Sequence, residues 1–479
     1  MKNRIQIVLA GLVLLLSMAT PAFADEAKPV KADRELPAGL IVPDVARPGP
    51  QFDVDKATAA YLNVLNDEQK AKSDAYFENG YYLDLLDTLI MITIAAFLLF
   101  GGVSRGIRDL AKRISQFCFD ALTSVLHFIH APAWLVNVTK YISHWAFFHT
   151  VIFIAMYFLA MFILTLPWNI YMGFFREHSY GLATQNFGDW FSETLIGLVV
   201  GIAVGSVVLA VIYSAVRRIG KSWWAWTGGI LFVFMIFMQM LYPVFISPLF
   251  NEYKPLPAGE LRDGLLSMAR ASQIPADNIY VFDASKQTTR VSANVSGMMG
   301  TTRISLNDNL LNRTSPEEIR AVMGHEMGHY VLNHSLRLVV YLTLVLVFGL
   351  LFVHFAYDGL LKRYGTRWGV SDRGDPAGLP LAAALLAIFM TVMTPLNNSI
   401  IRQAEAEADA FGLAVAGEPH GFATVAMRLS TYRKIHPGEL EEIMFYDHPS
   451  GYARVHRAMA WLKENQQDSR VIKAMQDNK

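Results

Sequence analysis

One stretch of this sequence organises the rest: Ser315-Pro316-Glu317-Glu318-Ile319-Arg320-Ala321-Val322-Met323-Gly324-His325-Glu326-Met327-Gly328-His329. It predicts a helix that opens with a Ser N-cap, a Pro at the first helical position and two acids at the positive end of the helix dipole. His325 and His329 are four residues apart, so they lie on one face and can share one zinc ion. Glu326 lies beside the first histidine, where it can take a proton from a metal-bound water.

A third ligand is expected from a second helix, Arg402-Gln403-Ala404-Glu405-Ala406-Glu407-Ala408-Asp409. Glu405 and Asp409 share a face, whereas Glu407 points roughly 200° around the helix from Glu405. The neighbours of Glu405 and Asp409 are small or apolar, which suits close helix packing. We therefore expect Glu405 to complete the zinc site and Asp409 to orient a ligand histidine. The alternative is a solvated acidic face, which fits Glu407 best.

Composition limits the other possibilities. Cys118 is the only cysteine, so neither an intrachain disulfide nor a thiolate zinc cage can form. The 41 basic residues equal the 41 acidic residues, which gives no electrostatic case for binding nucleic acid. The chain of 479 residues is 53% hydrophobic and only 17% charged, whereas soluble domains contain about 25% charged residues. A lipid bilayer is therefore the expected surroundings of much of the chain.

Six apolar segments have roughly the length needed to span a bilayer, and none has a charged residue in its central part. They are residues 83–103, 146–166, 195–216, 225–246, 338–355 and 379–394. A weaker segment, residues 117–138, is interrupted by Pro132. We interpret it as an amphipathic helix on the membrane surface, with a re-entrant piece as the alternative.

The first 24 residues are typical of an export signal. Lys2 and Arg4 precede an apolar run, and Ala22-Phe23-Ala24 forms a small-x-small cleavage site. Cleavage after Ala24 is favoured, and an uncleaved first transmembrane helix is the alternative. Residues 25–82 are predicted to form an extramembrane arm, followed by an N-terminal transmembrane bundle over residues 83–250.

Two polar regions are expected to pack together as one catalytic domain. The first, residues 251–337, carries the histidine helix, a further helix near residues 260–271 and extended stretches at 278–282, 288–294 and 302–306. The second, residues 397–479, is mostly helical and carries Glu405. Residues 338–396 supply two transmembrane helices between them. The predicted fold is mainly α: a polytopic α-helical membrane protein with a small α+β, zincin-like catalytic domain.

These motifs resemble the integral-membrane gluzincins, the zinc metallopeptidase family that includes the type I CAAX prenyl proteases. The resemblance rests on the histidine helix with Asn333-His334 beyond it, and on Arg402, Glu405, Ala408 and Asp409, which match an Arg-x-x-Glu-x-x-Ala-Asp pattern. Ile401 stands where that family often has Ser. Further matches are Leu166-Pro167-Trp168 with Tyr171, Ser247-Pro248-Leu249-Phe250 and Pro255-Leu256-Pro257.

The resemblance implies three more site residues. His448, in His448-Pro449, corresponds to a histidine that stabilises the oxyanion, and Arg454 corresponds to a structural ion-pair partner. The stretch Ser292-Ala293-Asn294-Val295-Ser296-Gly297 loosely matches an edge strand beside the zinc, with Asn294 as the substrate-positioning residue. Aligning on Gly297 instead brings Ser292 near the family asparagine. His334, five residues beyond His329, is expected on a different helix face.

The expected activity is therefore peptide-bond hydrolysis with one zinc ion per chain, on a peptide or protein substrate. A prenylated CAAX peptide and a misfolded or membrane protein are both compatible with the sequence. A catalytically silent scaffold or a transporter is the rival class. A transporter usually carries ionisable residues at membrane depth, which these spans lack, and a scaffold has little reason to keep Glu326. Because Lys and Arg favour cytoplasmic loops, their distribution places the catalytic domain on the periplasmic side of a bacterial inner membrane.

Overall fold

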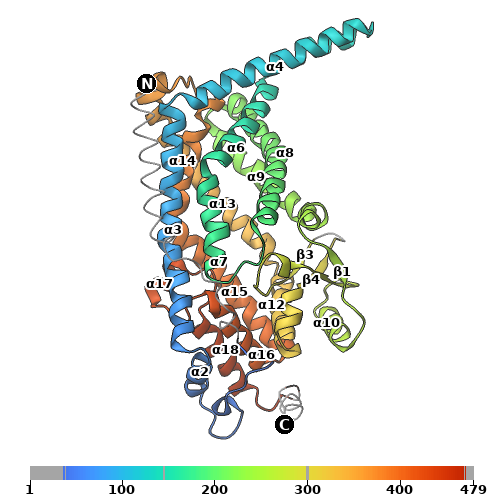
Figure 1. Cartoon of the computed structure of the whole chain (residues 1–479), viewed down its shortest axis with the longest axis vertical. Coiled ribbons are helices and arrows are strands. Elements are labelled where there is room, and N and C mark those ends of the chain that lie inside the picture. The colour runs from blue at the N-terminus through green and yellow to red at the C-terminus, as the bar shows by residue number, and fades with distance from the viewer. Residues whose placement is uncertain (1–35, 38, 144–145, 298–300, 469, 471–479) are drawn as a thin grey trace.

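The computed structural model describes residues 36–470 except 38, 144–145, 298–300 and 469. The export signal expected in residues 1–24 lies outside the described residues. Long helices form one half of the elongated molecule, and a sheet with shorter helices forms the other half (Figure 1).

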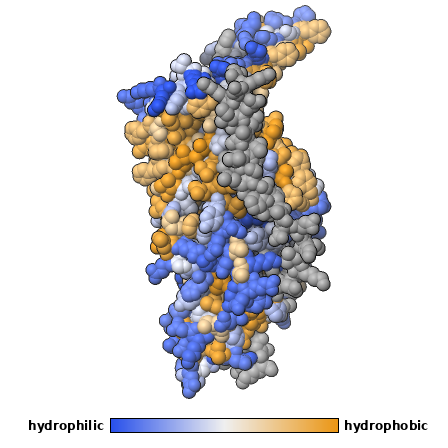
Figure 2. Space-filling view, turned by 60° about the vertical axis from the view of Figure 1, so that its left-hand side comes forward, coloured by the Kyte–Doolittle hydropathy of each residue, from blue (hydrophilic) through white to orange (hydrophobic). Residues whose placement is uncertain are grey.

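The apolar half consists of helices from both parts of the chain. These are α3 (Asp67–Phe100), α6 (Ala146–Ile170), α8 (Phe187–Ile219), α9 (Trp223–Leu241), α13 (His334–Trp368) and α14 (Leu379–Val392). By length and composition, four helical stretches of the described chain could cross a membrane, or five if the bent pair of α14 and α15 (Thr394–Ala416) counts as one span. Figure 2 shows a broad apolar surface over this half and a mostly polar surface over the other.

One of the four stretches, Phe187–Leu249, contains both α8 and α9 and has 63 residues. A straight helix of that length would measure roughly 95 Å, about three times the thickness of the hydrocarbon core. Gly220 ends α8 with a positive φ of +70°, and α9 then packs back against α8. The stretch is therefore two helices packed on each other, and it contains the apolar segments 195–216 and 225–246 of the sequence.

Helices α4 (Val103–Phe128) and α5 (Ala133–Ser143) occupy the end of the bundle opposite the sheet (Figure 1). Exposed apolar side chains recur along α4 at Leu110, Ile114, Phe117, Val125 and Phe128, a spacing that places them on one helix face. The amphipathic element therefore begins before residue 117. Among the described helices, α4 is not one of those apolar enough to span a membrane.

The polar half is built on a four-stranded sheet in the order β1-β2-β4-β3. Its strands are β1 (Tyr253–Pro255), β2 (Ile279–Phe282), β3 (Ala293–Ser296) and β4 (Arg303–Asn307). Only β2 and β4 are parallel, and β3 forms an edge. The expected strands at 278–282 and 302–306 are close to β2 and β4, whereas β3 lies later than the expected 288–294.

Most of the described helices outside the bundle belong to this half. They are α10 (Glu260–Ala271), α11 (Asp308–Arg313), α12 (Pro316–Val331), α15, α16 (Pro419–Leu429), α17 (Glu439–Phe445) and α18 (Gly451–Glu464). Buried apolar residues of α10, α12 and the strands form one core, which includes Leu265, Ile304 and Met323. The two polar regions of the sequence therefore meet in one domain, because α12 packs on α15 and α16.

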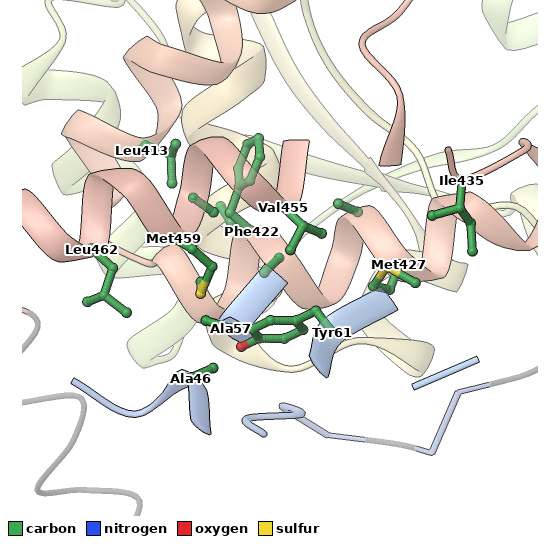
Figure 3. Packing of buried hydrophobic residues seen from close by; sticks show 14 of the residues in the cluster. Ala46, Ala57, Tyr61, Leu413, Phe422, Met427, Ile435, Val455, Met459 and Leu462 are labelled. Atoms are coloured by element: carbon green, nitrogen blue, oxygen red, sulfur yellow. The ribbon is translucent and has the colours of Figure 1, made fainter. Parts of the chain in front are cut away.

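The N-terminal arm is part of that domain. Its turn η2 (Asp44–Ala46) and helix α2 (Val54–Leu62) pack on α16 and α18, where Tyr61 is fully buried beside Val455 and Met459 (Figure 3). Helix α3 then starts at Asp67, well before the apolar segment at 83. The Ser73 hydroxyl donates to the carbonyls of Ser430 and Arg433 at 2.6 and 2.8 Å. One continuous helix thus joins the bundle to the polar domain.

Candidate metal centre

Helix α12 begins with a capping box. The Ser315 hydroxyl accepts the backbone N–H of Glu318 at 3.3 Å, and the Glu318 carboxylate accepts the N–H of Ser315 at 2.9 Å. Glu318 is fully buried and also forms an ion pair with Arg428 of α16 at 2.5 Å. The start of the histidine helix is therefore fixed to the rest of the domain.

Helices α12 and α15 approach each other to backbone contact. A Cβ atom on Gly412 would lie 2.7 Å from the backbone nitrogen of His325, and one on Gly324 would lie 2.9 Å from the carbonyl oxygen of Gly412. A Cβ on Gly328 would lie 3.1 Å from the Cα of Ala408. Only glycine leaves room for this approach, and the approach brings Glu405 of α15 to the two histidines of α12.

Three candidate ligand residues lie close together. The Nε2 atoms of His325 and His329 are 3.1 Å apart, and they lie 3.3 Å from Oε2 and from Oε1 of Glu405, respectively. Two tetrahedral ligands at about 2.0–2.1 Å from a zinc ion are separated by about 3.3–3.4 Å. The three residues therefore fit one tetrahedral zinc ion with a fourth position left open, and they are the group of the described chain that could hold a metal.

Asp409 lies behind His325, as the sequence predicts. Its buried carboxylate is 2.8 Å from His325 Nδ1, which leaves Nε2 to face the metal position. Arg454 of α18 contacts the same carboxylate at 3.0 Å and Glu405 at 3.4 Å, and Arg457 contacts Asp409 at 3.1 Å. The arginines neutralise two buried acids that lie close together.

His448 reaches the candidate ligands from the loop that precedes α18. Its Nε2 lies 3.3 Å from Glu405 Oε2, and its Nδ1 lies 2.8 Å from the Asp447 carboxylate. His448 and Glu326 both line the cleft of about 210 Å³ that contains His325 and Glu405. The structure thus brings together every residue assigned to the metal and its chemistry by sequence.

Electrostatics in the cleft suit proton transfer. Burial raises the pKa of Glu326, and the neighbouring His325 and His329 offset only part of that effect. Burial lowers the pKa of His325, but hydrogen bonds to Asp409 and Glu405 outweigh it and raise the pKa to about 9. A carboxylate with a raised pKa is a better base near neutral pH, and a metal ion bound at His325 displaces a proton.

Asn294 does not line this cleft. Ser292 and Ala293 are among the described residues that do, whereas Asn294 lines a separate cavity with Tyr242 of the bundle and Val339 of α13. Successive side chains of a strand point to opposite faces of the sheet. Asn294 therefore lies on the face away from Ala293 and α12.

The free edge of β3 presents backbone groups instead. The Asn307 N–H donates to the Ser292 carbonyl, and the pairs continue as Ala293 with Leu306 and Asn294 with Ser305. In an antiparallel ladder such pairs alternate, so the N–H and C=O groups of Ala293 and Val295 point away from β4. An extended chain could pair with them beside the metal position.

Two residues to which the sequence assigned no role at the metal, His334 and Glu407, lie behind the ligand His329. His334 is 1% exposed and its Nδ1 lies 3.0 Å from His329 Nδ1, while its Nε2 lies 3.2 Å from the Glu407 carboxylate. The expectation that His334 faces away from His329 assumed one continuous helix. It is wrong because α12 ends at Val331 and Asn333, with φ +54°, turns the chain before α13. The sequence feature that could have indicated this turn is the pair Asn333-His334.

Family comparisons agree with this geometry. Residues 255–462 match the model described as peptidase family M48, and residues 54–252 match the model described as CAAX prenyl protease N-terminal, five membrane helices. An uncharacterized metalloprotease of Bacillus subtilis is 29% identical over 67% of this chain and 78% of its own length. A CAAX prenyl protease 1 homolog of Oryza sativa is 30% identical over 55% of this chain and 62% of its own length.

The fold also matches a solved structure. The crystal structure of Ste24p from S. mikatae superposes with a TM-score of 0.61, covering 95% of this chain and 98% of that chain at 21% identity. This likeness concerns the fold, and it extends over both the helical bundle and the polar domain.

Gly412→Ala should weaken zinc binding about tenfold or more, because its methyl group meets the backbone of His325 and moves Glu405 away from the histidines. Gly264→Ala is the matched control, since a Cβ there meets no atom within 4 Å in α10. Chelator competition on both purified variants measures the effect. Equal zinc affinity in the two would show that the glycine contact does not set the ligand geometry.

Proposed function

The chain belongs to peptidase family M48, and we propose that it is a zinc-dependent endopeptidase that cleaves an extended segment of a peptide or protein. The observation that carries the proposal is the tetrahedral spacing of His325, His329 and Glu405 with Glu326 in the same cleft. A scaffold or a transporter has no use for a base placed beside a metal site.

A bound zinc ion supplies a Lewis acid and lowers the pKa of its water to about 7. Beside a zinc ion held by His325, His329 and Glu405, Glu326 would take a proton from the attacking water molecule and would deliver a proton to the leaving amine. Burial lowers the pKa of His448, so only its protonated fraction, with Nδ1 held by Asp447, donates from Nε2 to the developing oxyanion. One such donor contributes about 3 kcal/mol to stabilisation of the transition state.

The substrate is held along β3. Its backbone pairs with the outward N–H and C=O groups of Ala293 and Val295, which is how an edge strand binds an extended chain independently of its sequence. Side chains at alternate positions then enter the cleft near Ser292 or face the cavity that contains Asn294. Asn294 thus acts on the substrate from the side away from the metal.

Glu326→Gln should retain stoichiometric zinc and lose activity on an unstructured peptide by about 10²–10⁴-fold, because the ligands remain and only the base is removed. His325→Ala and Glu405→Ala should lose the zinc itself. Glu317→Gln is the matched control, since Glu317 lies in the first turn of the same helix and pairs with Arg320. Cleavage by Glu326→Gln at the parental rate would falsify the mechanism.

We also propose that the polar domain faces the periplasm of a bacterial inner membrane. The basic residues of three loops lie at the opposite end of the bundle, where Arg108 pairs with Asp375 at 2.5 Å and Arg217 donates to the Gly374 carbonyl at 2.9 Å. Arg105, Lys112, Arg113, Arg218 and Lys221 belong to the same loops and helix ends. Cytoplasmic ends of membrane helices are enriched in Lys and Arg.

A site on the outer side of the membrane meets exported and membrane proteins. This orientation favours such proteins over a prenylated cytosolic peptide as substrates.

An alkaline phosphatase fused after Lys479 should be active in cells, because that enzyme folds only outside the cytoplasm. The same enzyme fused within the loop between α8 and α9, after Lys221, should be inactive. A fluorescent cytoplasmic reporter that lights up after Lys479 would show that the orientation is reversed.

A further inference from the structure

His329 has a support of its own, distinct from that of His325. We propose that His334 and Glu407 are positioning residues that hold His329 through a chain of two hydrogen bonds and fix the nitrogen it offers to the metal. The inference rests on the proposed zinc site, and it assigns roles to two residues outside the ligand set and outside the cleft.

The contacts form a continuous path. His329 Nδ1 lies 3.0 Å from His334 Nδ1, and His334 Nε2 lies 3.2 Å from Glu407 Oε2. The two imidazole rings meet edge to face, with centroids 5.0 Å apart and an interplanar angle of 73°. Arg337 donates to the same Glu407 oxygen at 2.7 Å, and Gln403 donates to the other at 3.2 Å. His334 thus lies between a ligand and an anchored carboxylate.

The ring hydrogens of the two histidines determine which group donates in each hydrogen bond. His329 Nε2 faces His325 and Glu405, so it must offer a lone pair to the metal. Its Nδ1 then carries the hydrogen and donates to His334 Nδ1, which accepts. His334 Nε2 in turn carries a hydrogen and donates to the carboxylate of Glu407. Each of the three groups has the partner that its protonation state requires, and no other assignment of hydrogens satisfies both contacts with His329 bound through Nε2.

The two ligand histidines therefore rely on different partners. His325 Nδ1 contacts Asp409 directly at 2.8 Å, whereas His329 reaches its carboxylate through His334. Glu407 can serve this path because it points away from Glu405 on α15, and α13 packs on that flank. Asn333 makes the arrangement possible, since its left-handed conformation starts α13 with His334 turned back toward α12.

A buried histidine at a helix start could serve packing alone, so the test compares zinc affinity with stability. Purified full-length variants are titrated with zinc against a chelator, and the melting temperature of each metal-free variant is measured in parallel. His334→Leu should bind zinc about 10–100-fold more weakly. His334→Asn should recover part of that loss, because its amide oxygen lies where Nδ1 accepted the hydrogen bond. Glu407→Ala should weaken binding in the same direction, and Glu260→Ala, at an exposed glutamate of α10, is the matched control that should not.

Combining variants separates the two supports. His334→Leu with Glu407→Ala should bind zinc no more weakly than His334→Leu alone, because both break the same path. Glu407→Ala with Asp409→Ala should show the sum of the single effects, because they act on different ligands. Variants that lower only the melting temperature, or an Asn variant as weak as the Leu variant, would overturn the inference. Parent protein that binds no zinc would overturn the proposed function as well, so the two failures are distinguishable.

Discussion

The backbone contact between α12 and α15 is the constraint on which the site depends. Gly324, Gly328 and Gly412 let two helices approach more closely than any side chain would permit. Residues 76 and 80 positions apart in the sequence then supply one group of candidate ligands, and the same approach places Asp409 against His325. An ion held by a rigid helix pair keeps its geometry without help from loops.

The rest of the molecule holds that pair in place. Arg428 of α16 pairs with the capping residue Glu318 and donates to the carbonyls of Leu36 and Gly39 in the arm. The hydroxyl of Tyr61 in α2 forms a hydrogen bond of 2.8 Å with Nδ1 of His420 in α16. The arm, the capping box and the start of α12 therefore form one connected support. We expect disturbance of the arm to affect the metal site although none of the described arm residues lines the cleft.

Much of this arrangement follows from the sequence because helix signals are local. The N-cap at Ser315, the four-residue spacing of the histidines and the face shared by Glu405 and Asp409 require only helical geometry. Arg454 and His448 required a family pattern, because nothing in their own neighbourhoods predicts contact with α15. The contact of His334 with His329 was not predicted, because one residue in a left-handed conformation interrupts the helical periodicity between them. The cavity beside Asn294 depends on strand register, where a shift of one residue exchanges the two faces of the sheet. The burial of the arm depends on long-range packing alone.

The most direct test of the account is a crystal structure of the purified protein with anomalous diffraction measured at the zinc absorption edge. The account predicts one strong peak per chain at about 2.0–2.2 Å from His325 Nε2, His329 Nε2 and a carboxylate oxygen of Glu405. His334 should stand between His329 and Glu407, with Glu407 remote from the peak. A zinc peak coordinated by Glu407, or zinc in the crystal with none between α12 and α15, would contradict it.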